Sequence, residues 1–151
     1  DGKYASCSWH VSGVYWYDLS AAKPAYAEIN IPVRMNPPNG LAIYHDKALI
    51  AGVGGKYIYI DIHDKTPLDK IPRYGIAGVD IQGKPAIYDD MLYLTNRMSG
   101  DITVININDI TKPSLKERLN IQGNPGIVQD CGDSVLIPAG YQGLLLMKKP
   151  R

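Results

Sequence analysis

The stretch SGDITVININDITKP (residues 99–113) contains a glycine, then an alternating run of β-type residues, and then a turn that ends at a proline. Similar phrases occur at GGKYIYIDIHDKTP (residues 54–67) and SGVYWYDLSAAKP (residues 12–24). The alternation within each phrase favours a strand that lies between packed neighbours. A phrase written three times in one short chain indicates an internal structural repeat.

Two sets of markers give this repeat a period of about 43 residues. The first set is the glycine that opens each phrase: Gly13, Gly55, Gly100 and Gly143. These glycines are 42, 45 and 43 residues apart. The second set is an aspartate that precedes an apolar run: Asp46, Asp90 and Asp133, at spacings of 44 and 43. Because independent markers share one period, we expect each unit to be one copy of the same supersecondary structure.

Each unit contains four short runs of β-type composition. In the unit around the opening phrase, they cover residues 85–88, 91–95, 102–107 and 114–121. Gly, Pro, Asn and Asp cluster between the runs, and no segment has a sustained helical period. Four strands in roughly 40 to 50 residues are typical of a β-propeller blade. The sequence therefore predicts an all-β fold with minimal helix, a β-propeller of four-stranded antiparallel blades.

The phrases ITVININDITKP (residues 102–113) and YIYIDIHDKTP (residues 57–67) resemble the LVIVD repeat of bacterial and archaeal surface proteins. They are also similar to YVTN-type propeller repeats. The resemblance extends over essentially the whole chain, although the final LLLMKKPR lacks the aspartate and the turn. It implies a propeller in an exported protein, located outside the cell, on its surface or in the periplasm. It concerns architecture more than activity.

We expect residues 1–151 to form a single partial propeller domain of about 3.5 blades. Residues 1–36 and 123–151 would supply three strands each, and residues 37–82 and 83–122 would supply four each. An incomplete ring exposes unpaired backbone groups at its edges. We therefore expect the C-terminal half of a larger propeller, of about six to eight blades. The expected partner is the remaining half or a second chain; two copies pairing into seven blades and a closed four-bladed ring are the alternatives.

The composition argues against some classes of partner. Sixteen Lys and Arg residues stand against fifteen Asp and Glu, which leaves a net charge of +1. A nearly neutral chain has no counterion-release drive toward nucleic acid. No apolar run approaches the roughly 20 residues of a membrane span. The two cysteines, Cys7 and Cys131, are too few for a disulfide framework, and we interpret them as buried or idle thiols.

The repeated acidic residues and the three histidines are candidate metal ligands. Asp18, Asp61 and Asn106 recur near the end of the third strand of each unit. Recurrence in every unit favours side chains that hold the following turn over a single metal site. His45 and His63 are expected on the face opposite His10, so the three cannot converge on one ion. We predict no metal site in this chain, although a site joining His10 to residues outside the chain stays open.

We expect the functional face to be the one formed by the loops between strands two and three and between blades, because loops on a rigid scaffold carry most binding chemistry. The predicted ligand-binding residues on this face are His10, Arg34, Asn39, Lys84, Arg97, Asn124 and Tyr141. Cationic side chains beside amide donors suit a carboxylate, a phosphate or a sugar acid. The alternative is a solvated polar rim without a specific ligand.

Two functions follow from these expectations. The first is a binding or scaffold module that engages a protein, a glycan or an anionic ligand at this face. The second is the C-terminal half or a subunit of a propeller enzyme whose catalytic residues lie mostly in missing blades. In that case His10 would be the local acid or base, and Arg97 would hold an anion. The sequence identifies no cofactor.

Overall fold

The computed structural model describes residues 4–9, 13–18, 22, 25–30, 40–45, 47–52, 55–61 and 70–150, with backbone only for the first three strands. The first sheet contains β1 (Tyr4–Trp9), β2 (Gly13–Asp18) and β3 (Ala25–Asn30). The second contains β4 (Gly40–Tyr44), β5 (Lys47–Ala51), β6 (Tyr57–Ile60) and β7 (Arg73–Tyr74).

The third sheet contains β8 (Lys84–Tyr88), β9 (Met91–Asn96), β10 (Asp101–Asn106) and β11 (Ser114–Asn120). The fourth contains β12 (Gln129–Cys131), β13 (Ser134–Pro138) and β14 (Leu144–Lys148). Helix is nearly absent from the described residues; η2 (Gly140–Gln142) is a single 3-10 turn. The prediction of an all-β chain with four-stranded antiparallel sheets is confirmed, and the described sheets do not close into a barrel.

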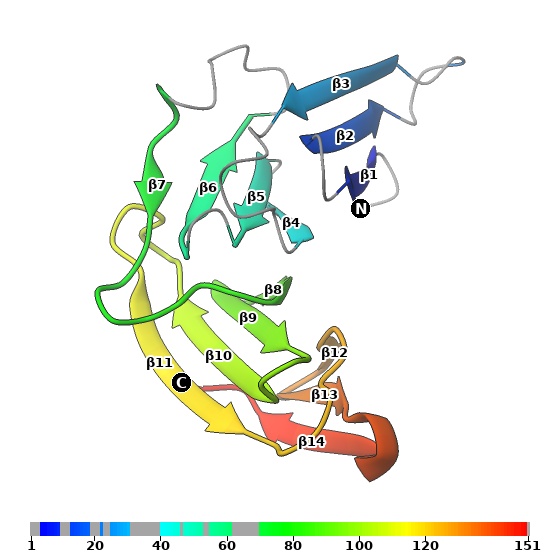
Figure 1. Cartoon of the computed structure of the whole chain (residues 1–151), viewed down its shortest axis with the longest axis vertical. Coiled ribbons are helices and arrows are strands. Elements are labelled where there is room, and N and C mark those ends of the chain that lie inside the picture. The colour runs from blue at the N-terminus through cyan, green and yellow to red at the C-terminus, as the bar shows by residue number, and fades with distance from the viewer. Residues whose placement is uncertain are drawn as a thin grey trace.

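The four sheets follow one another along an arc (Figure 1). The first strand of each sheet lies toward the concave side of the arc, and the later strands lie progressively farther out. β4 contacts β1 of the first sheet and β8 of the third sheet, so neighbouring sheets meet along their inner strands. The first and fourth sheets stand at the two ends of the arc.

Tight hairpin turns set the strand register. Between β8 and β9, the turn residues Asp89 and Asp90 have φ angles of 49° and 60°, which is the geometry of a type I′ turn. In the equivalent turn of the fourth sheet, Gly132 has a φ of 70°. The β8–β9 turn pairs Tyr88 with Met91 and thereby sets the register of the two strands. Alternate side chains along β9 point to opposite faces of the sheet.

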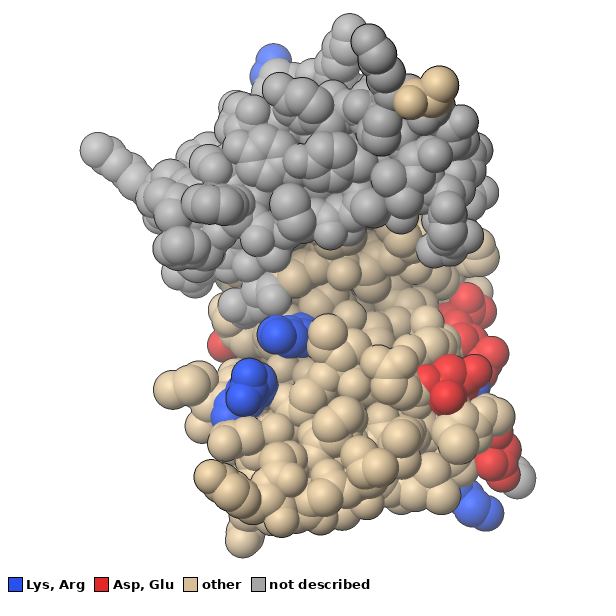
Figure 2. Space-filling view, turned by 90° about the vertical axis from the view of Figure 1, so that its right-hand side faces the viewer, with Lys and Arg blue, Asp and Glu red and all other residues tan. Residues whose placement is uncertain are grey.

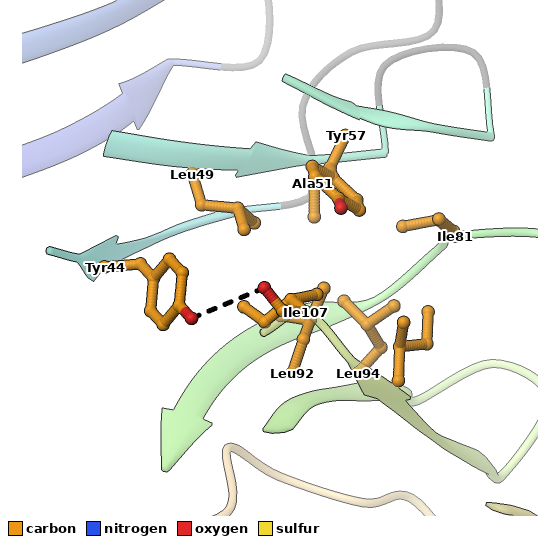
Figure 3. Packing of buried hydrophobic residues seen from close by; sticks show 9 residues of the cluster. Tyr44, Leu49, Ala51, Tyr57, Ile81, Leu92, Leu94 and Ile107 are labelled. Carbon is orange, nitrogen blue, oxygen red and sulfur yellow. Dashed lines mark hydrogen bonds between the residues drawn. The ribbon is translucent and has the colours of Figure 1, made fainter. Parts of the chain in front are cut away.

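The third sheet is buried on both faces. On one face, Leu92 and Leu94 pack with residues of the second sheet such as Leu49 (Figure 3). On the other face, Tyr93 packs with Val135 and Ile137 of the fourth sheet. All six side chains are buried. Cover on both faces explains why β9, MLYLTN, is nearly continuous in apolar residues.

Tyrosine hydroxyls tie neighbouring sheets together. Tyr44, the last residue of β4, donates its hydroxyl to the Asp90 carboxylate at 2.8 Å. The same hydroxyl lies 3.4 Å from the Ile107 carbonyl (Figure 3). Tyr88, the last residue of β8, donates to the Val128 carbonyl at 3.1 Å. Each tyrosine therefore bonds to the sheet that follows its own along the chain.

Candidate functional site

A hollow of about 320 Å³ lies at the end of the third sheet where β8 begins and β9 ends. Lys84 and Arg97 line it together with Thr95 and Met98. The register pairs Lys84 with Thr95, so the two strand ends place both cationic residues on the same rim. Both cationic side chains are exposed to solvent.

A second hollow of about 450 Å³ adjoins the first. Asn124 and Tyr141 line it, and Met98 lines both hollows. Tyr141 and Met98 are among the most exposed large side chains of the described residues. The two hollows therefore form one continuous rim of cationic, amide and apolar groups, which we call the Met98 rim: Lys84, Arg97, Met98, Asn124 and Tyr141.

Four of the seven predicted ligand-binding residues lie on the Met98 rim. Lys84 and Arg97 line the first hollow, and Asn124 and Tyr141 line the second. The other three, His10, Arg34 and Asn39, lie outside the described residues. The enzyme alternative depends on His10, so it gains no support from the described geometry.

The turn between β9 and β10 gives the rim its shape. The Asn96 side chain accepts hydrogen bonds from the backbone N–H groups of Met98 at 3.0 Å and Ser99 at 3.3 Å. This amide therefore holds the turn, as Asn commonly does two residues before a loop tip. The Met98 side chain consequently projects between the two hollows rather than packing into the sheet.

Gly83 shapes the floor of the first hollow. Its φ is 128°, and a Cβ at this position would lie 2.7 Å from the Thr95 carbonyl carbon and oxygen. Only glycine fits such a close approach without a backbone shift. The chain can therefore cross directly over the end of β9 before Lys84 begins β8.

One carboxylate at this end of the sheet is already engaged. Asp101 accepts hydrogen bonds from the Asn120 amide at 3.0 Å and the Arg118 guanidinium at 3.1 Å. The hydrogen bonds from Asn120, then Ser99 and Arg118, hold the pKa of Asp101 below its usual value. Its charge is thus balanced locally, and Lys84 and Arg97 give the rim its positive character.

The aspartate-containing turns and the Met98 rim lie at opposite ends of the strands. On the face shown in Figure 2, most of the acidic side chains lie along the right-hand side, and basic side chains lie at the left as well as at the lower right. The acidic end contains the hairpin turns with Asp89, Asp90 and Asp133. His45 also lies at this end, 3.9 Å from Asp90. The Met98 rim lies at the other end, where an approaching anion meets less repulsion.

Sequence reasoning missed a further hollow, of about 720 Å³, beside β7. Lys56, Arg73, Tyr74 and Asp80 line it. The segment from Arg73 to Asp80 folds back on itself, with Ile76 bridging to Val79. The glycine content of RYGIAGVDIQG (residues 73–83) was the available signal, because closely spaced glycines mark a tightly turning loop.

The comparison with protein-family models found no match, and neither did the comparison with curated proteins. The LVIVD resemblance therefore stays a prediction, and the site is argued from its geometry. No helix among the described residues is long and apolar enough to cross a membrane. In the same part of the chain, no three His, Cys, Asp or Glu side chains are grouped so as to hold a metal ion. Cys131 is an exposed free thiol.

Proposed function

We propose that this chain is the binding module of an exported protein, built as part of a β-propeller, and that the Met98 rim binds an anionic glycan. The observation that carries the proposal is that Lys84 and Arg97 line one hollow, which adjoins the hollow of Asn124 and Tyr141. The exported location is what the LVIVD resemblance implies.

The arrangement of the sheets supports the propeller part of the proposal. The four antiparallel sheets follow an arc with their first strands on the concave side, and the second, third and fourth sheets pack face to face (Figure 1). This is how blades follow one another around a propeller axis. The described sheets leave the ring open, so further sheets from the rest of a larger propeller or from a second chain would complete it.

The chemistry of the rim supports an acidic sugar as the ligand. The Arg97 guanidinium has the fork that matches a carboxylate in two parallel hydrogen bonds, and Lys84 adds a point charge. The Asn124 amide can both donate to and accept from sugar hydroxyls. The fully exposed Tyr141 ring offers an apolar surface with a polar tip, which suits the face of a sugar ring.

Isothermal titration calorimetry with an oligogalacturonate tests the proposal. We expect the unaltered chain to bind it and to bind its methyl ester much more weakly, because esterification removes the carboxylates. Lys84→Ala and Arg97→Ala should each weaken binding by about ten- to a hundredfold, since a charged hydrogen bond contributes about 1.5 to 3 kcal/mol. The matched control is Lys112→Ala, an exposed lysine in the loop after β10.

The control should bind like the unaltered chain. Equal affinity for the acid and its methyl ester would contradict an anionic ligand. Unchanged affinity in both the Lys84 and the Arg97 variants would place the ligand elsewhere, and the hollow beside Lys56 and Arg73 would be the next to test.

A further inference from the structure

We propose that the outer face of the fourth sheet is the docking surface for the first sheet of a second copy of this chain. We call it the leucine face and define it by Leu136, Leu144 and Leu146. The proposal rests on the propeller arrangement given under Proposed function and names the partner that extends it.

The leucine face is apolar and uncovered by the described residues. Leu144 is 65% exposed and Leu146 is 66% exposed. They alternate along β14, so they point to the same side of the sheet, and Leu146 pairs directly with Leu136 of β13. The opposite side of the same sheet carries Val135 and Ile137, which are buried against the third sheet. Thus one face of this sheet is covered and the other is not.

The third sheet shows what covers such a face. Tyr93 follows Asp90 by three residues, as Leu136 follows Asp133, so the two are equivalent in the predicted repeat. Tyr93 pairs with Val104 as Leu136 pairs with Leu146. Yet Tyr93 and Val104 are fully buried, because the fourth sheet packs on them. The leucine face therefore has the pattern of a face made to be covered by another sheet of the same kind.

The contact required is one that the chain already makes. The second sheet packs on the third, and the third packs on the fourth, each time with apolar side chains between two sheets. The leucine face is the next surface in that series. A sheet of this same repeat is thus the occupant that its shape and apolar character fit.

A second copy supplies such a sheet at the right place. The first sheet stands at the far end of the arc from the fourth (Figure 1). A two-fold axis would set the first sheet of each copy on the fourth sheet of the other, so both contacts form at once and the assembly closes. The described residues of each chain form four sheets, so the pair would contain eight of these sheets, whereas the number of strands expected from the sequence suggested seven blades.

Sedimentation-velocity centrifugation of the whole chain over a range of concentrations tests this inference. We expect a dimer as the largest species. The double variant Leu144→Asp, Leu146→Asp should raise the dimer dissociation constant by at least about a hundredfold, because it buries two charges in an apolar contact. Leu115→Asp is the matched control, because Leu115 is an exposed leucine on β11, outside the leucine face, and its substitution should leave the dimer intact.

A monomer at every concentration would overturn the inference, and the face would then belong to a sheet of another chain. A dimer that the double variant does not weaken, or oligomers that keep growing with concentration, would overturn it as well. Circular dichroism should show unchanged β-structure in both variants, since the replaced side chains are exposed.

Oligogalacturonate binding separates this inference from the proposed function. A monomeric chain that binds the probe through Arg97 would refute the dimer and leave the Met98 rim standing. A dimer that depends on the leucine face but ignores the probe would refute the glycan ligand and leave the dimer standing.

Discussion

At the scale of single residues, the position of a tyrosine decides whether its hydroxyl stabilises or destabilises the fold. Tyr44 and Tyr88 are each the last residue of a first strand, and both hydroxyls find acceptors in the next sheet. Tyr93 is fully buried in the middle of β9, and its hydroxyl has no hydrogen-bond partner among the described residues. Burial raises the pKa of Tyr93 above its ordinary value. The same residue type therefore stabilises the fold at two positions and costs stability at a third.

Phenylalanine substitutions at two of these tyrosines should change stability in opposite directions. We expect Tyr93→Phe to raise the free energy of unfolding by up to about 1 kcal/mol, because it removes an unsatisfied buried group. Tyr88→Phe should lower it by about 0.5 to 1.5 kcal/mol through loss of the bond to Val128. Urea unfolding measures both. Equal losses in the two variants would show that the Tyr93 hydroxyl has a partner.

At the scale of elements, Lys149 fastens the end of β14 to the neighbouring sheet. Its backbone N–H donates to the Asp133 carbonyl at 3.1 Å. Its ammonium group donates to Asp130 at 2.7 Å and to Asp89, in the β8–β9 turn, at 2.5 Å. The two carboxylates raise the pKa of Lys149, so the group stays charged well into the alkaline range. One cation therefore joins the β8–β9 turn to β12 of the adjacent sheet at the acidic end.

Replacing this lysine should loosen the fourth sheet. We expect Lys149→Met to lower the melting temperature by a few degrees in low salt, because Asp89 and Asp130 lose their shared counter-charge. The difference from the unaltered chain should shrink in 1 M NaCl, where the Debye length is about 3 Å. Lys112→Met, at an exposed lysine in the loop after β10, is the control and should have little effect. A decrease in melting temperature that does not depend on salt would indicate that the variant loses side-chain packing rather than a charge interaction.

At the scale of the whole molecule, apolar packing runs from sheet to sheet along the arc, whereas the charged groups lie mainly at the ends of the strands. Apolar side chains fill the spaces between the second, third and fourth sheets, so packing runs along the arc. The aspartate-containing turns lie at one end of the strands and the Met98 rim lies at the other. The exposed leucine face lies at one end of the arc. Ligand binding at the rim and association through the leucine face therefore use separate surfaces.

The stability of the chain should fall as the solution becomes acidic. Hydrogen bonds from Asn120, Ser99 and Arg118 hold the pKa of Asp101 below 3.8, its ordinary value. A carboxylate whose pKa is lower in the folded than in the unfolded state contributes its full stabilisation of the fold at pH values above the unfolded-state pKa. This contribution is lost as the pH falls through the folded-state pKa. Asp101→Asn should therefore flatten the decline in melting temperature below about pH 4. Glu117→Gln, an exposed carboxylate on β11, is the control; an equally steep decline in the Asp101 variant would contradict the assignment.

Local patterns predicted the strands well. The runs expected at residues 91–95 and 114–121 became β9 (Met91–Asn96) and β11 (Ser114–Asn120). The Asn106 side chain accepts the Asn108 N–H at 2.9 Å, which confirms its interpretation as a turn residue. Alternation and turn chemistry depend on residues that are close in sequence, so both can be recognised from the sequence alone.

The candidate site was only partly predictable. The repeat indicated which loops share an end of the sheets, but the pairing of Lys84 with Arg97 in one hollow and of Asn124 with Tyr141 in another came from the structure. The repeat could not show that the Asn96 amide is occupied in holding a turn. Nor could it reveal the hollow beside Arg73, which depends on a loop whose Ile81 N–H bonds to the Gly55 carbonyl 3.1 Å away.

The sequence by itself determined that this is an all-β chain of short antiparallel strands, because a period of two residues and glycine-rich turns leave no helical alternative. Only the tertiary structure decided which sheet faces are covered and which polar groups meet. Tyr44 and Asp90 are 46 residues apart in the chain, and Lys149 and Asp89 are 60 apart. Contacts of that kind depend on how whole sheets pack, and no local pattern encodes them.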